Sequence, residues 1–285
     1  MKTLKELYLF AKNELKEKEE GEALILSEAF LSAGRREISL YGEKTVPETE
    51  SEKFLEAVKM RKESRPLQYI TGYEYFGDMK LKVGEGVLIP REDTLPLCDI
   101  AADFIGEKNM VGIDLCSGSG AIALYIANKC KNSRVFAMEL YEGAIKYLEK
   151  NIEAYGERRV NFIKGDVLEN PDESLPSFDF IVSNPPYILT SEMTSLQEEV
   201  KKEPSTALDG GEDGLIFYRH IVKEWGKKLK EGGLMAFEAD PCEMEDIKML
   251  LLNEGFGNIG IINDLGDLQR VIYGYKYKNE FLNKF

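Results

Sequence analysis

Four consecutive residues, Asn184-Pro185-Pro186-Tyr187, combine a stiff backbone with side chains that can hold a planar nitrogen group. Neither proline has an N–H to donate, both have fixed φ angles, and Pro186 favours an extended conformation at Pro185. The asparagine adds a carbonyl acceptor and an NH2 donor, and the tyrosine adds an aromatic face with a polar tip. The tetrapeptide therefore suits a site that binds an NH2 group, although asparagine and proline are also common in ordinary loops.

A second group of candidate site residues is a glycine-containing turn followed by two acidic residues. Glycine in such a turn lets a ligand approach the backbone at a helix N-terminus. Glu139 ends the next predicted strand, where a carboxylate can accept hydrogen bonds from two ribose hydroxyls. Asp166 follows the third strand and can accept from an adenine amino group, with Val167 packing on the ring. The turn consists of Asp114, Leu115, Cys116, Ser117, Gly118, Ser119 and Gly120.

Two other interpretations of this turn stay open. Residues 118–123 also match the dinucleotide fingerprint G-x-G-x-x-A, which is typical of NAD-dependent Rossmann enzymes. A non-catalytic nucleotide-binding module would need the same turn. Glu139 and Asp166 can also be helix N-caps or first-turn acids without any ligand. A dehydrogenase leaves the Asn-Pro-Pro-Tyr tetrapeptide unexplained.

The elements that must position these residues alternate between strand and helix from residue 110 onwards, which predicts a parallel sheet covered on both faces. Ligands bind such sheets at the carboxyl ends of the strands. The link between the last two predicted strands is too short for a helical crossover, so we expect them to form an antiparallel hairpin. The predicted strands are 111–115, 135–138, 160–163, 178–183, 234–238, 259–263 and 271–275, and the predicted helices are 93–105, 121–128, 215–229 and 247–253.

The first 65 residues predict a separate helical bundle. Apolar residues recur at helical spacing over 4–15, a second helix covers 23–31, and a third follows Pro47, with Thr49 and Glu52 at capping-box spacing. Alternating residues from 79 to 89, with glycines at 84 and 86, predict a β-hairpin. We therefore expect a helical domain over 1–72, a linking hairpin over 73–90 and an α/β domain over 91–285.

Composition narrows the classes of protein to consider. The 37 basic and 51 acidic side chains give a net charge of −14, the wrong sign for binding a phosphate backbone, so nucleic acid is not the expected partner. No run of 18 apolar residues occurs and the N-terminus is charged, which predicts a cytoplasmic protein without a membrane partner. The four separated cysteines predict buried, reduced thiols and no metal site, and His220 is expected to be a helix residue rather than a catalytic base.

With these motifs in place, the chain resembles the S-adenosylmethionine-dependent methyltransferases, whose Rossmann-like sheet has seven strands and ends in an antiparallel hairpin. Within them it is similar to the release factor glutamine methyltransferases. The sequence departs from the family pattern in three places. Cys116 stands where the family has the first glycine of the turn, a replacement that is tolerated if the φ angle there is negative. Pro96 lies near a position that is usually acidic, and residues 238–241 replace a Glu-Ile-Gly run. The closer resemblance rests on 65–72, 87–91, Glu203-Pro204, Ala207-Leu208, Asp213-Gly214-Leu215, Asp264-Leu265-Gly266 and Arg270-Val271.

This resemblance implies a methyl donor, S-adenosylmethionine, which lies across the strand ends and becomes S-adenosylhomocysteine. The glycine turn, Glu139, Asp166, Val167 and Asn184 are expected to bind it, with Arg91 as a candidate donor-side contact. The implied substrate is the side-chain amide of the glutamine in the Gly-Gly-Gln motif of a peptide chain release factor, docked on the helical domain.

The implied catalytic residues are those of the tetrapeptide. We expect the Asn184 side-chain oxygen and the Pro185 carbonyl to accept the two amide hydrogens of the substrate, with Pro186 and Tyr187 completing the loop. Another protein glutamine, such as one in a ribosomal protein, or an exocyclic amine in nucleic acid remains an alternative, because each presents the same planar NH2 group.

Overall fold

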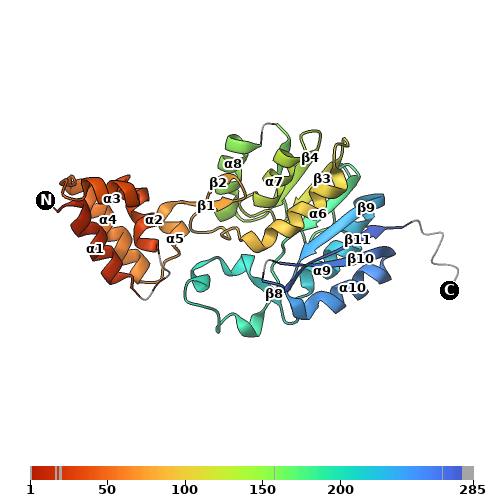
Figure 1. The fold of residues 1–285 in the computed structure, drawn as a ribbon. Helices are drawn as coiled ribbons and strands as arrows, with labels where there is room; N and C mark the ends of the chain where they lie inside the picture. Colours follow the sequence, from red (N-terminus) through yellow and green to blue (C-terminus); the bar gives the residue numbers. More distant parts are fainter. Residues whose placement is uncertain (1, 17, 19–20, 157, 265, 278–285) are drawn as a thin grey trace. The chain divides into compact units, whose positions relative to one another are not determined.

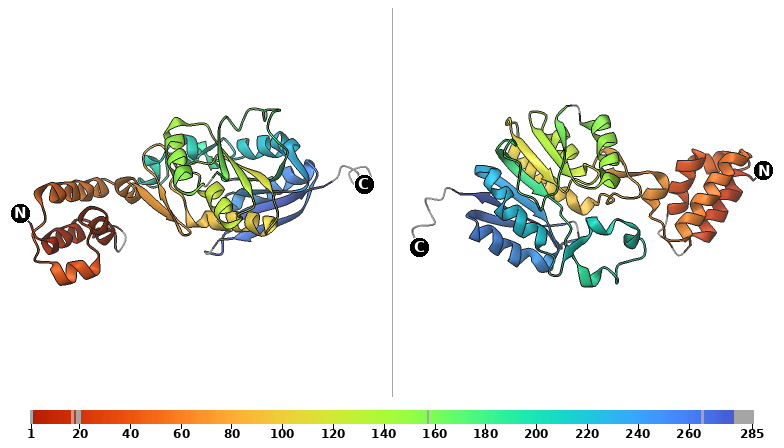
Figure 2. Two further views of the ribbon diagram at one scale, coloured as in Figure 1. Left: turned by 90° about the horizontal axis from the view of Figure 1, so that it is seen from above. Right: turned by 180° about the vertical axis from the view of Figure 1, so that it is seen from behind.

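The computed structural model describes residues 2–16, 18, 21–156, 158–264 and 266–277, and the chain divides into two compact units. The helical unit contains residues 1–73 together with 197–202. The sheet unit contains residues 74–196 and 203–285. Leu265 of the motif quoted above lies outside the described residues. Figure 1 and Figure 2 show the ribbon from three sides.

The helical unit contains the three predicted helices and two shorter ones that the sequence did not predict. Helix α1 begins with a true capping box between Thr3 and Glu6. The capping box predicted at Thr49 and Glu52 is wrong, because α4 begins directly after Pro47 and both residues lie inside it. Proline suits this position since it has no N–H to leave unsatisfied. The helices are α1 (Leu4–Glu14), α2 (Glu22–Leu31), α3 (Arg35–Tyr41), α4 (Glu48–Lys62) and α5 (Leu67–Thr71).

A buried ion-pair network holds this unit together. Two guanidinium nitrogens of Arg61 donate to the two carboxylate oxygens of Glu22, at 2.7 and 2.6 Å. Glu199, from the segment 197–202, accepts from Arg61 at 2.8 Å and from Lys18 at 3.0 Å. Because Arg61 and Glu22 are both almost fully buried, neither charge can be left without its partner.

The sheet unit is built on a seven-stranded sheet with the order β10-β11-β9-β6-β3-β4-β5. Strand β11 runs antiparallel to both β9 and β10, whereas β3, β4, β5, β6 and β9 pair in parallel. The predicted parallel sheet with a C-terminal antiparallel hairpin is therefore confirmed. The strands are β3 (Val111–Leu115), β4 (Arg134–Glu139), β5 (Val160–Lys164), β6 (Phe178–Ser183), β9 (Leu229–Glu238), β10 (Phe256–Asn263) and β11 (Gln269–Lys276).

Helices cover both faces of this sheet (Figure 1). Between the helices and the sheet lie two apolar cores. One face packs against α6 (Leu95–Ile105), α7 (Ala121–Lys129) and α8 (Glu142–Tyr155), of which α8 was not predicted. The other face packs against α9 (Ile216–Lys223) and α10 (Met244–Asn253). Buried on both faces, the central strands are apolar over most of their length, which is why the sequence predicts the bounds of β3 and β6 correctly.

The predicted hairpin over 79–89 is wrong in its pairing. Strand β2 (Met79–Lys82) pairs instead with β1 (Tyr73–Phe76), across a turn at Gly77 with a φ of +54°. Residues 84–90 form no strand because Gly86 lies against Gly143 at the start of α8, where a Cβ on Gly86 would lie 3.0 Å from the Gly143 Cα. The segment 84–90 is thereby free to line a pocket.

Several smaller predictions have clear outcomes. His220 is a partly exposed residue of α9, with Nε2 3.0 Å from the Glu169 carbonyl oxygen, as expected for a helix residue. Cys98 and Cys130 are buried, but Cys242 is exposed, so the prediction of burial is wrong there. Among the described residues, no helix combines the length and apolar character needed to cross a membrane.

Candidate active site

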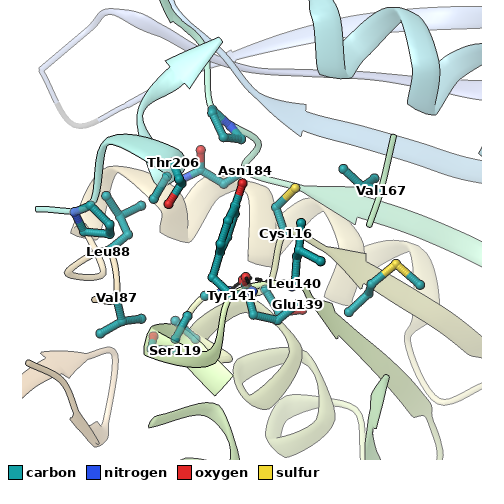
Figure 3. A pocket seen from close by; sticks show the side chains of 18 of the residues that line it. Val87, Leu88, Cys116, Ser119, Glu139, Leu140, Tyr141, Val167, Asn184 and Thr206 are labelled. Carbon is teal, nitrogen blue, oxygen red and sulfur yellow. Dashed lines mark hydrogen bonds between the residues drawn. The ribbon is translucent and has the colours of Figure 1, made fainter. Parts of the chain in front are cut away.

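A pocket opens where the carboxyl ends of β3, β4, β5 and β6 meet, and it lies within the sheet unit (Figure 3). It contains about 1060 Å³ of empty space, with the open solvent at its mouth included. Its wall comes from the turn after β3, the ends of β4 and β5, the tetrapeptide, residues 86–91 and residues 204–207. The pocket lies where the strand order reverses, between β3 and β6.

The turn after β3 contributes Cys116, Ser117, Gly118 and Ser119 to this wall, whereas Gly120 caps α7 behind it. Cys116 has a φ of +60°, so the negative φ that would make cysteine tolerable there is not present. A left-handed conformation costs a residue with a Cβ roughly 1–2 kcal/mol. A Cβ added at Gly118 would meet no atom closer than 4.0 Å, so the space above it is open to a ligand.

Asp114 does not line the pocket but supports the turn from below. Its side chain is fully buried, and Oδ2 accepts a hydrogen bond from the Ala123 N–H at 3.2 Å in the first turn of α7. The other oxygen, Oδ1, has no hydrogen-bond partner among the described residues. Burial raises the pKa of this carboxyl to about 8. The structure thus places Asp114 under the turn, where its carboxyl supports the start of α7.

Glu139 lies at the end of β4 and lines the pocket, but its carboxylate already accepts three backbone hydrogen bonds. Oε2 accepts from the Gly118 N–H at 2.8 Å, and Oε1 accepts from the N–H groups of Leu140 and Tyr141 at 2.8 and 2.9 Å. A carboxylate has about four acceptor sites. Two ribose hydroxyls can therefore bind only if one of these three bonds is shared or broken.

Asp166 and Val167 follow β5 and also line the pocket. Asp166 Oδ1 accepts from the Leu168 N–H at 2.9 Å, and no partner reaches Oδ2 within the described part of the chain. Trp225, which the sequence did not suggest, donates from its indole N–H to the Val167 carbonyl at 3.0 Å and fixes this loop. Tyr141 extends its ring across the pocket (Figure 3).

The tetrapeptide divides into two residues that line the pocket, Asn184 and Pro186, and two that do not, Pro185 and Tyr187. Tyr187 is instead packed against the core on the α9 face. Its backbone is covered by Gly210, where a Cβ would lie 2.6 Å from the Tyr187 Cα and 2.9 Å from the Pro186 oxygen. Short strands β7 (Ile188–Leu189) and β8 (Asp209–Gly211) pair in parallel beside it. The loop is therefore clamped by backbone contacts.

Arg91 lines the pocket and is held by Glu203. The Glu203 carboxylate also accepts from the Ile89 N–H at 2.9 Å, and burial raises its pKa. Glu203 belongs to the Glu-Pro pair quoted from the sequence, but nothing in the sequence indicates that it orients an arginine. This contact fixes residues 89–91 relative to residues 204–207, which form the adjoining part of the wall.

A second buried acid, Glu238, stands at the end of β9 behind the tetrapeptide and is 2% exposed. Burial raises its pKa to about 7, an effect opposed by the neighbouring polar side chains of Thr94 and Asn184 and by the positive charge of Arg270. Arg270 is itself paired with Asp264 at 3.2 Å. Glu238, Thr94 and Arg270 were not among the expected site residues. No group of three or more potential metal ligands occurs in the described residues.

Family models match both parts of the chain. A model described as the methyltransferase small domain matches residues 100–225, and one described as the PrmC N-terminal domain matches residues 6–72. Among solved structures, a methyltransferase from Pyrococcus furiosus is 19% identical, with a TM-score of 0.56 over 77% of this chain and 100% of that one. The hMettl16 catalytic domain in complex with the MAT2A 3'UTR hairpin 1 is 16% identical, with a TM-score of 0.59 over 93% of each chain. At these identities the solved structures show the fold alone.

Curated relatives are much closer in sequence. A protein of Clostridium acetobutylicum named release factor glutamine methyltransferase is 39% identical over 230 residues, which cover 80% of this chain and 81% of the relative. A protein of Thermodesulfovibrio yellowstonii with the same name is 36% identical over 85% of this chain and 88% of the relative. The alignments cover most of both proteins. The chain therefore belongs to the family of release factor glutamine methyltransferases.

Proposed function

We propose that this protein transfers a methyl group from S-adenosylmethionine to the side-chain amide nitrogen of the glutamine in the Gly-Gly-Gln motif of a peptide chain release factor. The observation that carries the proposal is the position of Asn184. It opens into the same pocket as Glu139 and Asp166, so a nitrogen held by the tetrapeptide faces a ligand held by the two acids.

The residues of the pocket fit S-adenosylmethionine. Glu139 offers its carboxylate to the ribose, Asp166 Oδ2 to the adenine amino group, and the open space above Gly118 accepts the part of the donor closest to the turn. Arg91, oriented by Glu203, offers a positive charge to the donor's carboxylate. When bound, S-adenosylmethionine supplies an electrophilic methyl group.

The protein must compensate for a weak nucleophile, because the lone pair of an amide nitrogen is delocalised into its carbonyl. Asn184 Oδ1, which lines the pocket, accepts one amide hydrogen, and the carbonyl of Pro185, which does not line the empty pocket, is the proposed acceptor of the other. Two acceptors aim the nitrogen and favour the positive charge that it gains. Both acceptors are held in place by the rigid Pro-Pro backbone and by the contact with Gly210. The methylated nitrogen then releases its proton to water, so no general base is required.

The deciding experiment incubates the protein with labelled S-adenosylmethionine and purified release factor, or with its Gln→Ala variant. We expect label on the wild-type factor alone. Asn184→Ala should reduce the transfer rate by about 100-fold or more, as expected for the loss of one preorganised hydrogen-bonding group. Donor affinity, measured by calorimetry, should stay close to that of the wild type, since Glu139 and Asp166 remain. Label on the Gln→Ala factor, or on RNA alone, would overturn the proposal.

A further inference from the structure

The carboxyl group of Glu238 lies directly behind the catalytic loop, and no step described above uses it. In the register of β6 and β9, Ser183 is paired with Phe237. The next residues of the two strands, Asn184 and Glu238, therefore leave the sheet as neighbours. This register places a buried acid beside the asparagine that contacts the substrate.

The environment of Glu238 is unusual for a buried acid. Thr94 and Asn184 lie beside the carboxyl and favour its charged form, and Oε2 has no hydrogen-bond partner among the described residues. A buried polar atom without a partner is costly, and a substitution that removed the acid would avoid that cost. The positive charge that favours its ionised form, Arg270, is also paired with Asp264. A role in the reaction would explain why an acid is kept here.

We propose that Glu238 is a positioning residue that sets the orientation of the Asn184 side-chain amide. An ionised carboxylate has acceptor sites only, so the group of Asn184 that faces it must be the NH2. The Asn184 carbonyl oxygen then points away from Glu238, towards the substrate. If the Asn184 amide were rotated by about 180°, its NH2 group would face the NH2 group of the glutamine and its oxygen would face the carboxylate. Neither the substrate nor Glu238 could then form a hydrogen bond with Asn184. This inference rests on the proposed function.

The charge of Glu238 controls this orientation, so the rate should depend on pH. The other charged or titratable groups that face the carboxyl are Arg270 from β11, Asp93 from the turn before α6, Cys98 from α6, and Tyr187 and Tyr218 from the α9 face. Burial raises the pKa of Glu238 to about 7. As the pH falls through this value, the carboxyl becomes protonated and can donate to the Asn184 oxygen, which competes with the substrate.

The test compares wild type with Glu238→Gln and Glu238→Ala at saturating donor and release factor. For wild type, kcat should rise through a pH of about 7. Glu238→Gln keeps an acceptor but cannot ionise, so its kcat should be reduced and flat with pH. Glu238→Ala should lose about 100-fold in kcat, the cost of a misplaced reacting group, with an unchanged donor Kd. Glu243→Gln is the matched control, because Glu243 is also a buried acid whose pKa burial raises to about 8, and its carboxylate accepts from the Asp240 N–H at 3.3 Å.

A second readout does not depend on activity. In 15N-labelled protein, the side-chain NH2 signals of Asn184 should shift with pH through about 7 in wild type and in Glu243→Gln, but not in Glu238→Gln. A wild type that fails to methylate release factor would contradict the proposed function, and the NH2 titration would still decide the inference. An unchanged pH profile and an unchanged titration in Glu238→Gln would overturn it. If Glu238→Ala does not fold, the isosteric Glu238→Gln remains decisive.

Discussion

Gly210 should be essential for methyl transfer although it does not line the pocket. A Cβ at this position would lie 2.6 Å from the Tyr187 Cα and 2.7 Å from the Tyr187 carbonyl carbon. Ordinary contacts of a Cβ begin at 3.4 Å, so the tetrapeptide would have to move by about 0.8 Å. The obstructing atoms are backbone, so a change of side-chain rotamer cannot relieve the clash. In Gly210→Ala the substrate nitrogen should therefore be held out of line with the methyl group.

A displacement of this size is expected to cost about 100-fold in rate, or about 2.7 kcal/mol in the barrier. The assay is a single-turnover measurement of label transfer to release factor at saturating donor. Donor affinity should change little, because Glu139 ends β4 and Asp166 follows β5, both away from β7 and β8 in sequence. Gly226→Ala is the matched control, since its Cβ would meet Phe256 ring atoms at 3.7 Å and Met235 Cε at 3.9 Å, which are ordinary contact distances. Equal rates for Gly210→Ala and Gly226→Ala would refute the clamping of the loop by Gly210.

Three further predictions concern stability. Cys116→Gly relieves the cost of a left-handed φ at a residue with a Cβ, roughly 1–2 kcal/mol, which is partly offset by the freedom of glycine in the unfolded chain. The free energy of unfolding, measured in urea, should therefore rise by up to about 1 kcal/mol. A fall would mean that the packing of the thiol matters more than the backbone strain. Glu22→Ala removes the main partner of the buried Arg61 charge and should lower the unfolding free energy of the helical unit by about 3 kcal/mol, as measured by its susceptibility to proteolysis. A change below about 1 kcal/mol would contradict the importance of this pair. Burial raises the pKa of Asp114 from an ordinary 3.8 to about 8, so between these pH values the folded state keeps a proton that the unfolded state has lost. The protein should therefore lose stability as the pH rises from about 4 to 8, and Asp114→Asn should show a smaller fall in Tm between pH 5.5 and 8 than wild type. Parallel Tm curves for the two proteins would contradict the raised pKa of Asp114.

The sequence alone predicts most of the sheet, and it predicts both the acids proposed to bind the donor and the asparagine proposed to bind the substrate. Strands β3 and β6 have the predicted bounds because a strand buried on both faces is a short apolar run. Glu139, Asp166 and Asn184 line one pocket because parallel strands end at the same edge. In each case the local sequence pattern agrees with the general rule that parallel sheets bind ligands at the carboxyl ends of their strands.

Other features depend on contacts that no local pattern reveals. Glu238 and Arg270 come together because β11 pairs with β9 in a register that sets Val271 opposite Glu238. The left-handed φ at Cys116 follows from the path of the turn, and a cysteine there gives the opposite expectation. The predicted hairpin at 79–89 is wrong although residues 84–87 do form a turn, in which the Val87 N–H donates to the Gly84 carbonyl at 3.3 Å. This turn packs Gly86 against Gly143 of α8, and no strand follows it. Such pairings are tertiary, and propensity does not encode them.

The inclusion of residues 197–202 in the helical unit has a consequence for the modularity of this enzyme. The unit is discontinuous in sequence, since its last piece lies more than a hundred residues after the end of α5 and is held there by Arg61 and Lys18. A family model that ends at residue 72 therefore describes only part of it. Exchanging this unit between relatives, or inheriting it by recombination, requires two segments to change together. If the N-terminal fragment were transplanted without residues 197–202, its Arg61 and Lys18 would have to pair with whatever residue the recipient protein has in place of Glu199.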